Sequence, residues 1–295
     1  MDIRAILYGV VFIAMWASAF TSARIIVADA PPLTALAFRF LISGLLGVAL
    51  ARLLGQSWRL TRPQWRATIL FGLCQNALYL GLNFVAMQTV EASLAAIIAS
   101  SMPLLVGLAG WVIYGERIGM LGVLGLITGF VGVMLIMGAR LQGGADLAGI
   151  ALCVLGVLAL STATLAIRGA TSGGNLLMVV GLQMLVGSLV LAVVGLSTEQ
   201  LTVTWSWTLV AAFAYTTLVP GLAATLIWFE LVNRVGATKA ATFHFLSPFF
   251  GVLIAALILH EALGPLDIAG VVVITLGILA VQLSRQKKPV ANDPP

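Results

Sequence analysis

Charged residues are scarce in this chain, since Asp, Glu, Lys and Arg together make up 8% of its 295 residues. Soluble domains carry roughly a quarter of charged residues. Hydrophobic residues account for 61% of the chain, so the few charges could not cover its surface in water. The composition therefore excludes a soluble protein and predicts an integral membrane protein that uses lipid as its solvent.

Side chains that carry catalysis or bind metals are few as well. The two cysteines, Cys74 and Cys153, fall inside predicted helices and match no metal-binding spacing. The two histidines, His244 and His260, belong to no cluster of nucleophiles, bases or metal ligands, which an enzyme would need. We expect no metal and no cofactor, and an intramembrane enzyme acting on lipid is an unfavoured alternative.

Carboxylates are absent from the predicted membrane interior. All ten Asp and Glu residues fall at predicted helix ends or in loops. Carriers driven by protons or sodium commonly bind the coupling ion with an intramembrane carboxylate. Apart from tyrosines, His244 is the one titratable group expected near mid-depth. Facilitated diffusion is therefore the favoured mode of any transport, with a proton-coupled multidrug or metabolite antiporter as the alternative.

The chain does have ten apolar runs of about 20 residues, the length that crosses ~30 Å of hydrocarbon. These runs are continuous and do not alternate, which excludes the strands of a membrane barrel. The sequence thus predicts an all-α protein with ten transmembrane helices. The expected spans are Ile6–Val27, Leu33–Leu54, Ala67–Met87, Ala92–Tyr114, Ile118–Gly138, Leu147–Ile167, Asn175–Leu196, Trp207–Leu231, Lys239–Leu259 and Pro265–Ser284.

Lys and Arg residues are distributed unequally between the two sides of this arrangement. The side with both termini carries twelve, the other side has only Arg24 and Arg140, and Arg39 lies within a span. An excess of Lys and Arg marks the cytoplasmic side, so both termini are predicted to be cytoplasmic and no nucleic-acid partner is expected. The twelve are Arg4, Arg52, Arg59, Arg62, Arg66, Arg117, Arg168, Arg234, Lys239, Arg285, Lys287 and Lys288.

A sequence repeat relates the two halves of the chain. Residues 88–132 align without a gap on residues 233–277, an offset of 145, and Pro103 then matches Pro248. Each half has five spans, and because five is odd the second half must enter the membrane from the side where the first one left. Two inverted five-helix repeats around a central cavity are typical of transporters.

The repeats are parts of one unit. We expect a single ten-helix transporter domain over residues 1–284, with repeat one at 4–138 and repeat two at 147–284. The charged, proline-rich residues 285–295 are predicted to be a disordered cytoplasmic tail.

The motifs at the span ends resemble those of a known family. A Glu closes the proline-bearing fourth span of each half, in Tyr114–Glu116 and Leu259–Glu261, and Trp16–Phe20 and Phe38–Phe40 stand in the first two spans. With these motifs in this order, residues 4–284 resemble the drug/metabolite transporter superfamily, and its EamA-type ten-helix exporters most of all. The resemblance implies export of amino acids or related small metabolites across the bacterial inner membrane. It does not fix the substrate, because the superfamily also includes sugar-nucleotide, triose-phosphate and multidrug carriers.

Polar and aromatic side chains at mid-span depth are the candidates for a substrate site. A cavity with aromatic walls and a few amides and hydroxyls suits a small ligand with an apolar body and a polar head. The alternative is that these groups bond across helices and only hold the bundle together. The substrate-binding residues that we expect are Trp16, Tyr79, Asn83, Ser101, His244 and Ser247.

The paired prolines are candidates for gating. A proline inside a helix removes one backbone hydrogen bond and clashes with the preceding turn. Pro103 and Pro248 occupy equivalent places near mid-membrane, which favours a central gate over plain kinks. Pro220 has no such partner, because Gln75 stands at the equivalent position, and it is interpreted as a local kink.

Arg39 is the only strong charge well inside a predicted span. Charges in hydrocarbon are usually paired, or they reach the interface. Asp29 in the adjoining loop is an available partner, so a structural ion pair is favoured, and direct capture of a substrate carboxylate comes second.

Glycines recur at helical spacing in the fifth and tenth spans. Gly125 and Gly129 form a GxxxG pair, and Gly270 and Gly277 recur in the tenth span. Such faces let two helices approach closely, so packing inside the bundle is expected, with a dimer seam as the lesser option. The expected partners are a small-molecule substrate and the lipid bilayer, and the protein is predicted to be a monomer or a homodimer.

Overall fold

The computed structural model describes residues 3–116, 119–142, 144, 146–166 and 174–286. Within these residues ten helices are long and apolar enough to cross a membrane, which confirms the predicted all-α architecture with ten transmembrane helices. The predicted cytoplasmic residues Arg117, Arg168, Lys287 and Lys288 lie outside the described part, as do residues 287–295 of the predicted tail.

Four of the ten described spans are interrupted, and six are continuous. The continuous ones are α1 (Ile3–Asp29), α2 (Pro32–Leu53), α7 (Met120–Gln142), α8 (Leu147–Ala166), α9 (Leu176–Thr198) and α14 (Pro265–Gln286). The third span is α3 (Arg62–Phe71), η1 (Gly72–Leu80) and α4 (Gly81–Ala86), and the fourth is α5 (Ala92–Ser100) and α6 (Met102–Val112). The eighth is α10 (Trp207–Leu218), η2 (Val219–Ala223) and α11 (Ala224–Val235), and the ninth is α12 (Ala237–Thr242), η3 (Phe243–Leu246) and α13 (Ser247–Leu259).

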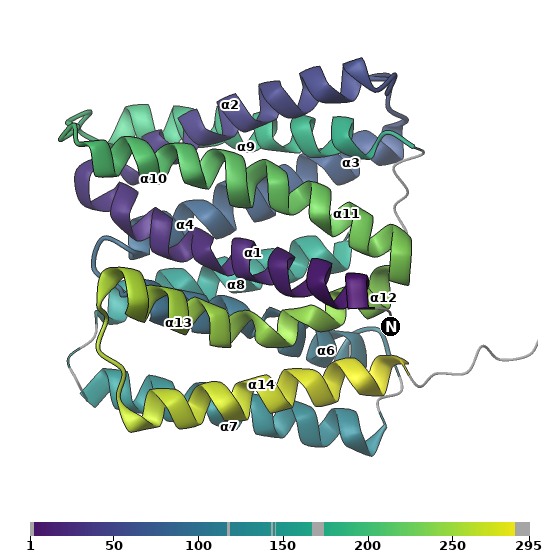
Figure 1. The fold of residues 1–295 in the computed structure, drawn as a ribbon, viewed down its shortest axis with the longest axis vertical. Helices are drawn as coiled ribbons and strands as arrows, with labels where there is room; N and C mark the ends of the chain where they lie inside the picture. Colours follow the sequence, from purple (N-terminus) through teal and green to yellow (C-terminus); the bar gives the residue numbers. More distant parts are fainter. Residues whose placement is uncertain (1–2, 117–118, 143, 145, 167–173, 287–295) are drawn as a thin grey trace, which may run out of the picture.

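The helices lie roughly side by side as one bundle (Figure 1). The pair α2 and α9 forms one edge, the pair α7 and α14 forms the opposite edge, and α1 and α8 lie between them. The start of α1 and the end of α14 are at the same end of the bundle (Figure 1). Large apolar side chains stay exposed on its sides, such as Met134 at 73% and Leu189 at 68%, as expected where lipid covers the surface.

The third and eighth spans contain π-helical segments at equivalent positions. Shifted back by 145 residues, Val219–Ala223 falls inside Gly72–Leu80. The interpretation of Pro220 as a local kink without a counterpart is therefore corrected, because the third span widens in the same way around Gln75. Wide turns of this kind occur frequently at functional sites.

The fourth span breaks at Ser101, two residues before Pro103. The carbonyl of Ile98 accepts hydrogen bonds from the Ser101 backbone N–H at 3.1 Å and from the Ser101 hydroxyl at 2.7 Å. In the ninth span the 3₁₀ turn Phe243–Leu246 comes before the helix that contains Pro248. Both breaks therefore lie next to a buried proline. In the fourth span the Ser101 hydroxyl adds a second hydrogen bond to the carbonyl at the break.

Glycines bring α7 and α14 into backbone contact within the chain. A Cβ atom at Gly125 would lie 2.8 Å from the Gly277 carbonyl oxygen, and one at Gly132 would lie 2.8 Å from the Ile274 backbone nitrogen. There is no room for a side chain at either position.

We expect Gly125→Ala to lower the thermal unfolding midpoint of the detergent-solubilised protein, because overpacking costs about 1–3 kcal/mol. Gly138→Ala is the matched control, since Gly138 is on the same helix and a Cβ there would meet nothing within 4 Å. The control should be neutral or mildly stabilising. Equal midpoints for the two variants would contradict the close packing.

Candidate functional site

A cavity of about 510 Å³ lies among the helices of the bundle. Its wall is formed mainly by α1, α2, α8, α9 and the interrupted third and eighth spans, with one residue each from the fourth and ninth spans, so both halves of the chain contribute. Aromatic rings dominate this wall. They include Phe12, Trp16, Phe20, Phe71, Phe84 and Trp228.

The cavity is accessible at one end of the bundle and covered at the other. It reaches Gln64 in the first turn of α3 and Leu176 at the start of α9, and Leu176 is 38% exposed. At the opposite end it stops under Phe84 and Met87, which are 2% and 1% exposed. We call the end with Gln64 and Leu176 the open end and the other the closed end.

Four of the six predicted binding residues lie in the cavity wall, and two do not. Trp16, Tyr79, Asn83 and His244 line the cavity. Ser101 and Ser247 are buried elsewhere, at 6% and 1% exposure. The Ser101 hydroxyl is turned back to the Ile98 carbonyl.

The prolines proposed as gates, Pro103 and Pro248, are buried and do not line the cavity. Met102, the residue before Pro103, does line the cavity. A gating role of these prolines stays a prediction.

His244 lies in a cluster of aromatic rings. Its ring centroid is 5.4 Å from that of Trp16, 5.6 Å from that of Phe12 and 5.8 Å from that of Trp228, with edge-on geometry in each case. Edge-to-face packing of this kind fixes the orientation of rings. The cluster therefore lines one side of the cavity with aromatic rings.

Arg39 lines the cavity and is not paired with Asp29, which corrects the ion pair expected from the sequence. The Asp29 carboxylate accepts a hydrogen bond from the Ser206 hydroxyl at 3.3 Å, and the Asp29 carbonyl accepts one from the Thr204 N–H at 2.8 Å. Arg39 is only 5% exposed, and its guanidinium lies 5.1 Å from the Phe40 ring centroid. Among the described residues Arg39 has no carboxylate partner, and its Nε makes no hydrogen bond.

Asn76, Phe84 and Gly221 also line the cavity, and the sequence did not single them out. Gln75, Tyr79 and Asn83 share one face of an ordinary helix, whereas Asn76 is turned about 100° from Gln75. The π-helical segment widens the turn, and both Gln75 and Asn76 reach the wall. The Asn76 amide also donates to the Gln183 carbonyl at 2.9 Å, which ties the third span to α9.

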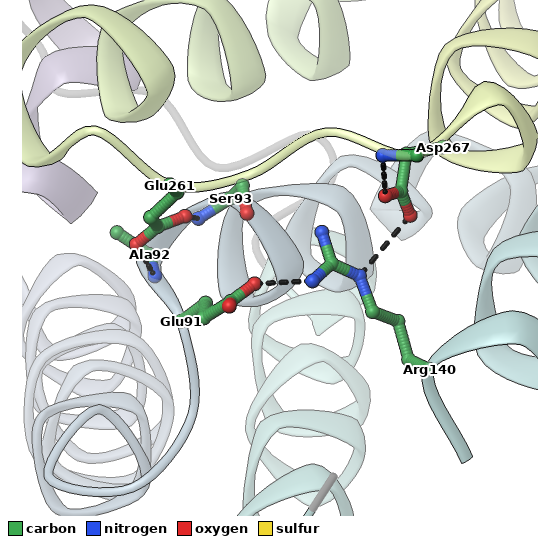
Figure 2. Close-up of polar contacts among 7 residues, drawn as sticks. Glu91, Ala92, Ser93, Arg140, Glu261 and Asp267 are labelled. Carbon is green, nitrogen blue, oxygen red and sulfur yellow. Dashed lines mark hydrogen bonds and ion pairs between the residues drawn. The ribbon is translucent and has the colours of Figure 1, made fainter. Parts of the chain in front are cut away.

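Carboxylates hold the closed end together (Figure 2). The Glu261 carboxylate, just after α13, accepts hydrogen bonds from the backbone N–H groups of Ala92 and Ser93 at 2.8 and 2.9 Å. It thereby caps the start of α5, where the adjacent Glu91 side chain makes no cap. Glu91 instead pairs with Arg140, whose Nε also donates to Asp267 at 3.1 Å. The guanidinium of Arg140 on α7 thus links the start of α5 to α14.

Two further contacts connect helix ends across the α2–α9 edge. At the closed end, Glu199 after α9 accepts hydrogen bonds from the N–H groups of Leu33 and Thr34 at 2.7 and 2.9 Å. At the open end, the Gln56 side-chain oxygen after α2 accepts one from the Met178 N–H at 3.0 Å. Each helix of the pair is therefore capped by a residue that follows the other helix.

In the described part of the chain, ten helices suited to crossing a membrane surround a cavity that is accessible from one end and covered at the other, which is the architecture of a membrane transporter. The sequence model of the EamA-like transporter family matches residues 3–138 and, a second time, residues 147–283. The chain belongs to this family, which confirms the resemblance drawn from the motifs.

Relatives of similar length are described as transporters. YvbV of Bacillus subtilis, an uncharacterized transporter, is 27% identical over 94% of this chain and 91% of its own length. The uncharacterized transporter sll0355 of Synechocystis is 28% identical over 95% of this chain and 93% of its own. A solved structure at 22% identity has the same fold, with a TM-score of 0.69 over 98% of this chain and 100% of that one.

Glu261→Ala is expected to destabilise the protein, because it removes the acceptor of two backbone N–H groups. Each buried donor left unsatisfied costs about 1–3 kcal/mol. The readout is the thermal unfolding midpoint in detergent. Glu230→Ala is the control, since Glu230 is half exposed and contacts Arg234 at 3.6 Å. A midpoint for Glu261→Ala as high as that of the control would show that the cap contributes nothing.

Proposed function

We propose that this protein exports amino acids or related small metabolites from the cytoplasm by alternating access. The observation that carries the proposal is the one-sided cavity, whose aromatic wall and few polar groups suit a small ligand with an apolar body and a polar head. Arg59, Arg62 and Arg66 lie at or near the start of α3, at the open end. By the distribution of basic residues this end faces the cytoplasm, where an export substrate would enter.

An inverted duplication is the second part of the proposal. The interrupted spans are the third and fourth of one half and the third and fourth of the other, counted from each half's start. Met178 stands 145 residues after Leu33, and each donates its N–H to a side chain that follows its partner helix. These equivalences support two halves that exchange roles when the cavity opens to the other side.

Facilitated diffusion is the favoured mode of transport. No Asp or Glu occurs among the described residues that line the cavity, and His244 is held among aromatic rings. A proton-coupled antiporter would use a titratable group in contact with the substrate. Among the described residues of the wall, His244 and Tyr79 are the candidates for that role.

Reconstituted into proteoliposomes, the protein should give saturable flux of at least one compound in a panel of amino acids, nucleobases and lipophilic cations. Trp16→Ala should lower the apparent affinity about tenfold, because it removes a large apolar contact. Trp111→Ala, which changes a 44% exposed ring on α6, is the matched control. Flux that never saturates would indicate a channel, and the absence of flux for the whole panel would count against the proposed substrates.

Counterflow of a transported compound should keep the same initial rate when the pH gradient across the liposomes is abolished with an ionophore. The reason is that the described residues of the cavity wall include no carboxylate to bind a coupling proton. Loss of counterflow under these conditions, together with its loss in His244→Gln, would favour the proton-coupled antiporter instead.

A further inference from the structure

We infer that the cavity selects ligands that carry an anionic group, a carboxylate on a small apolar body, and that Arg39 binds this group. The inference rests on the proposed function, since it names the chemistry of the substrate that the same cavity would take. Arg39 is the only Arg or Lys among the described residues of the wall.

The first reason is the uncompensated charge. A cation buried in a bundle is normally paired with a carboxylate or bonded to backbone carbonyls. Arg39 is 95% buried, because its exposed fraction is 5%, yet within the described residues it has no carboxylate partner and its Nε has no acceptor. The guanidinium lies over the Phe40 ring, which carries no charge. An anion entering the cavity would supply the missing partner.

The second reason is access to the guanidinium. Arg39 and Gly221 are both in the cavity wall. A Cβ atom at Gly221 would lie 3.7 Å from Arg39 Nη2 and 3.3 Å from the Ser43 hydroxyl. The glycine on the π-helical segment η2 therefore leaves the space beside Nη2 free of side chain. A planar guanidinium with free N–H groups binds a carboxylate with two parallel hydrogen bonds.

The third reason is the distribution of the remaining polar atoms. The Tyr79 hydroxyl and the Asn83 side-chain oxygen belong to residues of the wall, and neither has a hydrogen-bond partner among the described residues. A hydroxyl can donate to a carboxylate, and an amide oxygen can accept from an ammonium group. Both residues thus add polar groups of these two kinds to the wall, while the two atoms themselves are shielded from solvent in this conformation.

The test uses three probes that share one phenylpropyl body and differ in charge, namely 3-phenylpropionate, 3-phenylpropanamide and 3-phenylpropylamine. L-phenylalanine is added to separate a zwitterion from a simple acid. Binding is measured as the shift in thermal unfolding midpoint of the full-length protein in detergent at increasing probe concentration. We expect 3-phenylpropionate to bind at least about tenfold more tightly than the amide or the amine, because a charge-assisted hydrogen bond is involved.

Variants separate the anion site from a structural role. Arg39→Gln should lose the preference for the carboxylate, Arg39→Lys should keep part of it, and neither should lower the midpoint without ligand, since among the described residues Arg39 has no ion-pair partner to lose. Arg59→Gln, which removes an exposed charge outside the cavity, should behave as the parent protein. Gly221→Val, which fills the space beside Nη2, should weaken carboxylate binding while Arg39 is intact.

Equal binding of the amide or the amine, an unchanged preference in Arg39→Gln, or no shift with any probe would overturn the inference. A fall in the ligand-free midpoint of Arg39→Gln would assign Arg39 a structural role and also overturn it. Saturable flux of a cation or neutral compound that is independent of Arg39 would leave the transporter standing without the anion site. Arg39-dependent binding of 3-phenylpropionate without flux would leave the anion site and remove the proposed transport.

Discussion

Backbone N–H groups at helix starts must find acceptors even where water is scarce, and this constraint links the two halves of the structure. In hydrocarbon an unsatisfied backbone group costs several kcal/mol. Several spans meet the requirement with acceptors from another span: Glu199 for α2, Gln56 for α9 and Glu261 for α5. Because the acceptor follows one helix and the donor begins another, each cap also fixes the relative position of two helices.

The acceptors differ between the two ends of the bundle, and the difference has consequences for its conformation. At the closed end they are carboxylates, which are also attracted to the partial positive charge of a helix start. At the open end α9 is capped by the neutral amide of Gln56. The closed end also has Arg140 bound to Glu91 and Asp267. Opening the closed end by separating α5, α7 and α14 would break these charged contacts.

Much of the fold follows from the sequence, because hydropathy and the distribution of basic residues depend on properties of single residues. The break near Pro103 was also predictable, since proline cannot donate a hydrogen bond. The π-helical segment around Gln75 was not, because no proline marks it and wide turns have no simple sequence signature. Its effect on the site is direct: it brings both Gln75 and Asn76 to the cavity wall.

The partners of polar side chains were the least predictable part, because the sequence does not tell which loop returns to which helix end. Asp29 was available to Arg39 by proximity along the chain, but the loop before α10 brings Ser206 to it instead. Ser101 was expected in the cavity, but the break at that residue turns its hydroxyl back to Ile98. Asp29 bonds to Ser206, and no Asp or Glu lies among the described residues of the cavity wall, so the proposed ligand would be the partner of Arg39. A ligand with a carboxylate would supply this missing partner of Arg39. Its binding energy would then favour whichever conformation of the protein binds the ligand most tightly.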